Sequence, residues 1–146
     1  MLEQAQIRLS RYGERVRFKL RSFNDPFPAC DAITACISLH HVPSLEEKEA
    51  LYERTYNALR EGGIFVNADA AVPTHGKEKE RLYRYWASHL VASGIPEERA
   101  WQHFEEWAEE DSYFSLSEEL GALSAVGFDA HCVWREGPSA VVIGRR

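Results

Sequence analysis

The chain has 146 residues, 45% of them hydrophobic, and a formal net charge of −6. This length fits one domain, and the hydrophobic fraction is typical of a packed globular protein rather than a disordered one. The negative charge argues against binding of nucleic acid through its phosphate backbone, because proteins that bind in this way are basic. Three scattered cysteines are too few for a disulfide framework or a zinc site. No signal peptide or membrane-spanning run is visible, so we expect a cytoplasmic protein without membrane contact.

The first third of the chain predicts one helix and two strands. Residues 1–13 place apolar side chains on one helical stripe, and Gly13 predicts the end of this helix. Residues 15–23 alternate apolar and basic side chains, which predicts a strand with one face in water. After a turn at 24–28, the nearly continuous small and apolar run at 30–39 predicts a strand buried on both faces of a parallel sheet.

The remainder alternates between helices and strands. Ser44 with Glu47 forms a capping-box pattern at the start of a helix, and Gly62 with Gly63 predicts its end. The later predicted elements are a strand at 64–69, two aromatic-rich helices at 77–92 and 96–111, a capped helix ending at Gly127, and two strands at 128–137 and 139–146 joined by a tight turn. This order predicts an α/β fold with a mostly parallel sheet and a C-terminal antiparallel hairpin.

The succession DAITACISLHHV, LREGGIFVNAD and a terminal strand hairpin resembles class I S-adenosylmethionine-dependent methyltransferases over nearly the whole chain. In that family the fourth strand ends in Leu-His-His or a similar sequence, and an amphipathic helix follows. Leu-x-x-Gly-Gly then precedes the fifth strand. The resemblance implies a Rossmann-like fold, S-adenosylmethionine (SAM) as the cofactor, and methyl transfer to a small-molecule acceptor.

The sequence departs from the family at its beginning. The family's first strand carries a glycine-rich loop, broadly Gly-x-Gly-x-Gly, and its second strand ends in an acidic residue that binds the ribose; this sequence contains neither. We therefore expect a single truncated domain over 1–146 that lacks the first two strands and carries a helical cover over 74–112. Methyl transfer by this chain alone is then expected to be impaired or absent. The alternative is a non-catalytic remnant that acts as an oligomerising or partner-binding module.

The same departure predicts how the chain associates. The family's strand order is 3-2-1-4-5-7-6, so the two missing strands would lie beside residues 32–37. That strand would become an exposed edge whose backbone groups need hydrogen-bond partners. We expect a homodimer, or an exchange of elements between two chains, that covers this strand.

The adjacent histidines His40 and His41 follow this strand and admit three interpretations. Neighbours at a strand end point to opposite sides, so we expect no metal site there. The open alternatives are acid–base catalysis, a wall under the cofactor formed by residues 36–41, and a packed loop with one buried, hydrogen-bonded histidine. Asp69 likewise either opens toward the site or caps a loop.

The resemblance also assigns site residues. It places Ser22 and Phe23 beside the adenine, and it assigns the cofactor wall to Cys36, Ile37, Ser38 and His41. Where a base is needed, the candidates are His41 and His75. The candidates for binding a small-molecule substrate are Tyr83, Arg84 and Trp86, although aromatic residues at helical spacing usually form core. The acidic segment 103–111 is expected to be a solvated helix face.

Overall fold

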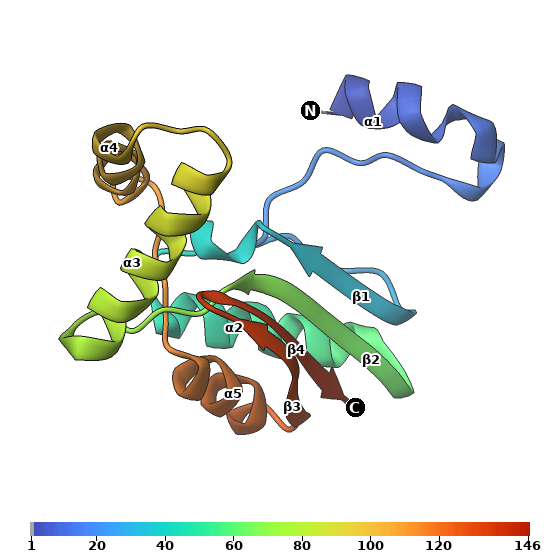
Figure 1. Ribbon diagram of the computed structural model, residues 1–146. Coiled ribbons are helices and arrows are strands. Elements are labelled where there is room, and N and C mark those ends of the chain that lie inside the picture. The colour runs from blue at the N-terminus through green and yellow to red at the C-terminus, as the bar shows by residue number, and fades with distance from the viewer. Residues whose placement is uncertain (1) are drawn as a thin grey trace.

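The computed structural model describes residues 2–146 and contains one four-stranded sheet in the order β1-β2-β4-β3 (Figure 1). Strand β1 pairs with β2 in parallel, whereas β4 pairs antiparallel with both β2 and β3. The strands span Cys30–Cys36 (β1), Leu59–Ala70 (β2), Asp129–Glu136 (β3) and Ser139–Arg145 (β4). The predicted α/β architecture and its terminal antiparallel hairpin are confirmed.

Five α-helices and two short 3-10 segments surround the sheet. They are α1 (Leu2–Leu9), η1 (Ser10–Arg15), η2 (Leu39–His41), α2 (Leu45–Ala58), α3 (Gly76–Ala92), α4 (Glu97–Trp107) and α5 (Leu116–Ala125). In Figure 1, α2 and α5 lie against one face of the sheet, α3 and α4 lie beyond its end, and α1 stands apart. Within residues 2–146, no helix combines the length and apolar character needed to cross a membrane.

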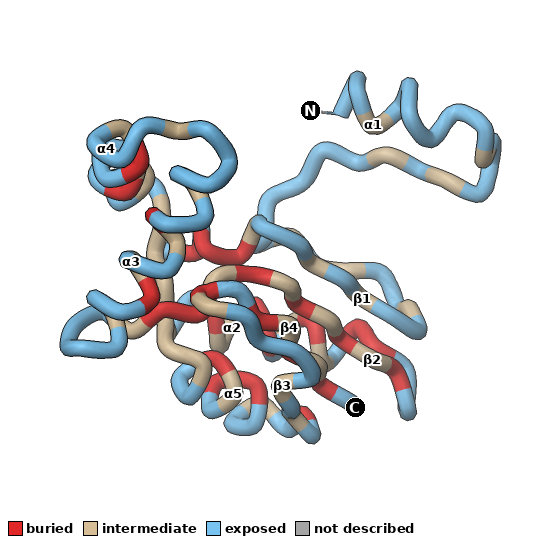
Figure 2. Tube along the Cα trace, in the orientation of Figure 1, coloured by how far each residue is buried: buried red, intermediate tan, exposed pale blue. Residues whose placement is uncertain are grey.

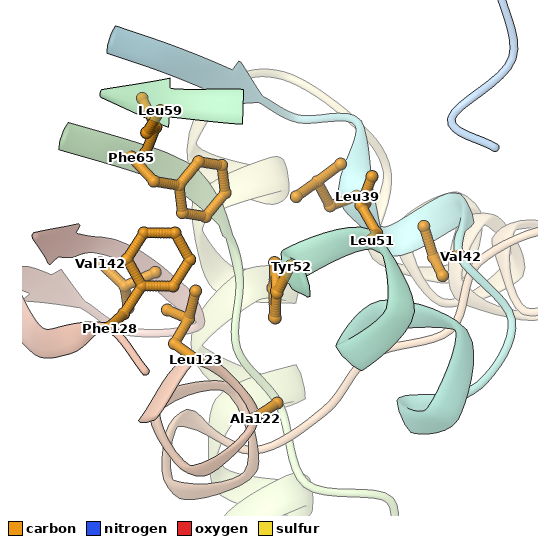
Figure 3. Close-up of a cluster of buried hydrophobic side chains, with 10 residues drawn as sticks. All are labelled: Leu39, Val42, Leu51, Tyr52, Leu59, Phe65, Ala122, Leu123, Phe128 and Val142. Atoms are coloured by element: carbon orange, nitrogen blue, oxygen red, sulfur yellow. The ribbon is translucent and has the colours of Figure 1, made fainter. Parts of the chain in front are cut away.

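The main core lies between the sheet and the pair α2 and α5 (Figure 3). Phe65 of β2 packs against Tyr52 of α2, with ring centroids 5.6 Å apart, and Phe128 lies 6.1 Å from Phe65. The same cluster extends to Leu39, which is 3% exposed. Burial of Leu39 therefore anchors η2, the turn that carries the two histidines.

The opposite face of the sheet is open. On this face Val66 of β2 lies between Ile143 of β4 and Thr34 of β1, its partners in the two neighbouring strands. Side chains along this face are half-buried or exposed (Figure 2), and the helices that pack on the sheet, α2 and α5, lie on the other side. Strand β1 is the edge of the sheet, as the sequence analysis expected for residues 32–37.

The predicted strand over residues 15–23 is wrong. Residues 16–22 have no regular secondary structure, and Leu20 is 89% exposed. Alternating apolar and basic side chains favour a strand only where a neighbouring strand accepts its backbone hydrogen bonds. None of residues 2–146 supplies that neighbour, so the segment is an extended loop that stands away from the sheet together with α1 (Figure 1).

The predicted start of α2 is correct, and its predicted end is wrong. The Ser44 hydroxyl accepts a hydrogen bond from the Glu47 N–H at 3.1 Å and caps the helix. The helix ends at Ala58 because Leu59 is already extended and pairs with Cys30. Gly62, with φ 76°, serves a bulge within β2 rather than the helix end.

Candidate functional site

Asp69, at the carboxyl end of β2, holds the histidine turn in place. Its Oδ2 atom accepts hydrogen bonds from the backbone N–H groups of Ser38, Leu39 and His40, at 3.2, 2.9 and 3.2 Å. Asp69 is 7% exposed, and a buried carboxylate is stable there because these donors replace water. Asp69 therefore both caps a loop and faces the candidate site.

The same carboxylate fixes the ring of His40. Asp69 Oδ1 lies 2.7 Å from His40 Nδ1, and His40 is 7% exposed. A carboxylate accepts hydrogen bonds, so in the neutral imidazole the proton lies on Nδ1 and the lone pair on Nε2. The interpretation of a buried, hydrogen-bonded histidine describes His40.

Asp111, which follows α4, joins both histidines. Its Oδ1 atom lies 3.2 Å from His41 Nδ1 and 3.7 Å from His40 Nε2. Expecting these neighbours to point to opposite sides was wrong, because they lie on the 3-10 turn η2 and not on a strand. The loop is tied to the turn by the Ser112 N–H, which donates to the His40 carbonyl at 2.7 Å.

Tyr113 completes this cluster. Its hydroxyl donates a hydrogen bond to Asp111 Oδ2 at 2.6 Å. Burial, helped by this hydrogen bond to a carboxylate, raises the pKa of the Tyr113 hydroxyl well above its usual value. Tyr113 therefore stays protonated and keeps donating to Asp111 across the neutral pH range.

These side chains face a cavity of about 500 Å³. The cavity lies at the carboxyl ends of β1 and β2, where α/β folds bind ligands, because Ile37 follows β1 and Asp69 and Ala70 end β2. Its walls are His40, His41, Asp69, Asp111 and Tyr113, together with Ile37, Ala70, Trp86, Glu106, Trp107, Glu110 and Ser139. The volume suits a small molecule, and the mixture of indole rings and polar groups is typical of such pockets.

The structure brings some of the expected site residues to this cavity and leaves others away from it. Ile37, His41 and Trp86 line it. Tyr83 lines a neighbouring space of about 280 Å³ that shares Asp111 and Tyr113. Arg84 is exposed and pairs with Glu80, and His75 is exposed at the start of α3 and bonds to Thr74.

The other residues expected to hold the cofactor line two smaller spaces. Ser22 and Phe23 border a space of about 150 Å³ together with His41. Cys36 and Ser38 border another of about 190 Å³, which Phe23 shares. Each is smaller than the roughly 300–1,000 Å³ of usual small-ligand sites. Residues 2–146 contain no glycine-rich turn that would extend either space.

The sequence analysis missed the residues that follow α4. The segment 103–111, predicted to be a solvated helix face, contains Glu110 and Asp111, and Tyr113 follows it. In the structure the chain after α4 folds back onto η2 and brings these residues to the cavity. One signal in the sequence could have indicated a buried site here: the acidic run that ends at Asp111 is followed closely by the aromatic pair Tyr113 and Phe114, and aromatic pairs are unusual on a solvated face.

Comparison with solved structures places this fold among methyltransferases. The chain is similar to the S-adenosylmethionine-dependent methyltransferase SibL (TM-score 0.66, 23% identity), with 99% of this chain and 40% of that chain covered. The pyocyanin biosynthetic protein PhzM gives a TM-score of 0.69 at 16% identity, covering 99% of this chain and 40% of that one. An O-methyltransferase family 2 protein from Planctomyces limnophilus, solved with apigenin, gives a TM-score of 0.63 at 19% identity, covering 99% and 39%.

These similarities define the fold of the chain. It has a class I methyltransferase-like, Rossmann-like fold, and it spans about 40% of the length of the solved proteins that it matches. No family model and no curated protein sequence matches it.

Proposed function

We propose that this chain provides the acceptor-binding side of a SAM-dependent methyl transfer to a small molecule. The observation that carries the proposal is that His40, with Nδ1 committed to Asp69, lines a cavity of about 500 Å³ in a methyltransferase-like fold. Such a cavity excludes water and orients a small acceptor between Trp86 and the histidine turn. SAM would supply the methyl group.

The proton of the acceptor goes to His40 in this proposal. The bond between the acceptor's heteroatom and its hydrogen breaks, and the hydrogen becomes the Nε2–H of the imidazolium. Asp69 and Asp111 lie on the two sides of the ring and stabilise this positive charge. His41 is the second candidate base, because it lines the same cavity, whereas His75 lies outside its walls. Tyr83 and Trp86 are proposed to contact the acceptor from α3.

The cofactor side is proposed to be incomplete in this chain. Ser22 and Phe23 would contact the adenine, and Cys36, Ile37 and Ser38 would form the wall beneath the cofactor. Because the two spaces beside these residues are small, we propose that methyl transfer by this chain alone is impaired and needs further residues to enclose SAM.

Ligand binding tests the acceptor pocket directly. Saturation-transfer NMR with a panel of small hydroxylated aromatic compounds should find binders. Ser139→Phe should weaken their binding at least about tenfold, because it fills the cavity that Ser139 lines. Ser117→Phe, on the exposed surface of α5, is the matched control and should leave binding unchanged. Failure to bind any compound, or equal effects of the two variants, would contradict the proposal.

A second candidate function is favoured by the open sheet. The edge strand β1 and the uncovered face around Val66 suit a non-catalytic module that forms a homodimer or binds a partner, with α1 exchanged between chains. Calorimetric titration with SAM separates the two functions. Micromolar binding of SAM would exclude the non-catalytic module. If SAM does not bind, the small-molecule binding experiment described above separates the two functions, because only the methyl-transfer function requires an acceptor in the cavity.

Homodimerisation has its own test. Light scattering coupled to size-exclusion chromatography at micromolar concentration should give the mass of a dimer. Thr34→Lys and Val66→Lys, both on the open face, should give monomers that keep their circular dichroism. Ser117→Lys should leave the dimer intact, since Ser117 lies on the far side of the sheet on α5. A monomeric parent chain would exclude this proposal.

A further inference from the structure

We propose that His40, His41 and Asp111 bind a divalent transition-metal ion. The three side chains come from the turn η2 and from the loop after α4, and each offers one ligand atom. One ligand atom of each residue lies within 4.8 Å of the other two, and Asp111 Oδ1 is near both His40 Nε2 and His41 Nδ1. The methyl-transfer proposal does not require this site, although a metal ion and a proton would compete for the same lone pair of His40.

The separations of the ligand atoms fit a metal ion. Ligands about 2.1 Å from a tetrahedral ion lie about 3.4 Å from each other. Asp111 Oδ1 lies 3.2 Å from His41 Nδ1 and 3.7 Å from His40 Nε2, close to that spacing on both sides. The His41 side chain is 49% exposed, so its ring can turn to bring the third pair together.

The hydrogen bonds of His40 and Asp111 resemble those that hold metal ligands in place in other proteins. Histidine ligands of metals donate their second ring N–H to a carboxylate or carbonyl, and this fixes the tautomer and the direction of the lone pair. Asp69 accepts from His40 Nδ1 in this way at 2.7 Å and leaves Nε2 free. Tyr113 donates to Asp111 Oδ2, which leaves Oδ1 for the ion.

Within residues 2–146, His40 Nε2 has no hydrogen-bond partner. Its distance of 3.7 Å to Asp111 Oδ1 is beyond hydrogen-bond length, although the ring is only 9% exposed. His40 and Asp111 both line the cavity, so the Nε2 lone pair and the carboxylate oxygen offer two donor atoms to a cation there. A metal ion between the two atoms satisfies both.

The ligand types select the ion. Two imidazole nitrogens and one carboxylate favour Zn²⁺, Co²⁺ or Fe²⁺ over Mg²⁺ and Ca²⁺, which prefer oxygen ligands. Three protein ligands leave at least one coordination position, and it opens on the cavity of about 500 Å³. Glu110, on the wall of that cavity, adds negative charge that attracts a cation. A bound ion would polarise an oxygen atom of a small ligand there, in place of proton transfer to His40, because one lone pair cannot hold both.

Binding of cobalt and zinc to the purified full chain tests the proposal without any methyl acceptor. After removal of metals with a chelator, Co²⁺ should bind with one-to-one stoichiometry and give the visible absorption of a low-coordinate cobalt–histidine site. Zn²⁺ should displace it, and calorimetry should give micromolar or tighter affinity. Mg²⁺ should neither bind nor displace Co²⁺.

Matched variants locate the site. His41 is exposed enough that His41→Gln should keep the fold. This variant should weaken Co²⁺ binding at least about tenfold, and Asp111→Asn should weaken it to a similar extent. The control is His131→Gln, because His131 and Asp129 form an exposed two-residue pair at 2.9 Å that lacks a third ligand. The proposal is overturned if Co²⁺ gives no visible spectrum, or if His131→Gln weakens binding as much as His41→Gln does. Circular dichroism of every variant verifies the fold.

Discussion

Asp69 holds His40 through two different atoms of the carboxylate: Oδ1 lies 2.7 Å from the ring Nδ1, and Oδ2 accepts from the backbone N–H at 3.2 Å. One side chain of β2 therefore sets both the backbone of the turn and the orientation of its buried ring. The loop after α4 adds Asp111 on the other side of the ring, 71 residues along the chain from His40. This arrangement underlies both the proposed acceptor site and the proposed metal site.

Replacing Asp69 should therefore destabilise the protein. In Asp69→Asn an NH₂ group replaces one carboxylate oxygen. An NH₂ group cannot accept a hydrogen bond, so the mutant loses either the bonds from the backbone N–H groups or the bond from the His40 Nδ1–H. We expect a loss of about 2–3 kcal/mol in the free energy of unfolding, measured with urea. Asp31→Asn, which removes an exposed pair with Arg60, should change it little. Similar losses in the two variants would contradict the role given to Asp69.

The buried pair of Lys48 and Glu119 should respond differently to single and double substitution. Lys48 donates to Glu119 Oε1, the Tyr52 hydroxyl donates to Oε2 at 2.5 Å, and all three residues are buried. Glu119→Leu leaves the Lys48 charge unpaired and should cost about 3–5 kcal/mol in urea unfolding. Adding Lys48→Met should recover part of that loss. A double variant no more stable than Glu119→Leu would show that the unpaired charge is not the cause.

Alkaline titration should separate the tyrosines. Burial, followed by the charge and hydrogen bond of Glu119, raises the pKa of Tyr52, and burial, followed by the hydrogen bond to Asp111, raises that of Tyr113. Both stay protonated in the folded state at a pH where an unfolded chain ionises, near 10.

Their contribution to stability is therefore complete below about pH 10 and is lost as the pH rises above that value. Phenolate absorbance should show a late phase that coincides with loss of circular dichroism, and Tyr52→Phe and Tyr113→Phe should each reduce its amplitude. If all six tyrosines ionised together near pH 10 in the folded protein, this prediction would fail.

Two glycines should respond in opposite directions to substitution by alanine. A Cβ at Gly144 in β4 would lie 2.8 Å from the Phe128 ring, so Gly144→Ala should cost about 1–3 kcal/mol through overpacking. A Cβ at Gly121 in α5 meets nothing within 4 Å, so Gly121→Ala should stabilise the protein by up to about 1 kcal/mol. Thermal and urea unfolding measure both, and a stabilising Gly144→Ala would contradict the packing.

Several elements could be predicted from local signals in the amino-acid sequence. Ser44 caps α2 at the predicted position, because a capping hydroxyl acts within three residues. The capped helix predicted before Gly127 is α5, and Ser115 is its cap. The hairpin of β3 and β4 turns at Gly137, with φ 56°, where glycine is favoured. The order of these elements, with the resemblance they carry, predicted the α/β methyltransferase-like fold.

Features that depend on contacts between residues far apart in the chain could not be predicted in this way. Residues 15–23 form no strand, because a strand needs a neighbour that the sequence pattern does not reveal. His40 and His41 meet Asp111 because the buried Leu39 and the Asp69 carboxylate bend their segment into a turn, and the loop after α4 folds back onto it. Hydrogen bonds and burial between distant segments fix the directions of these side chains, and no local periodicity encodes such long-range contacts.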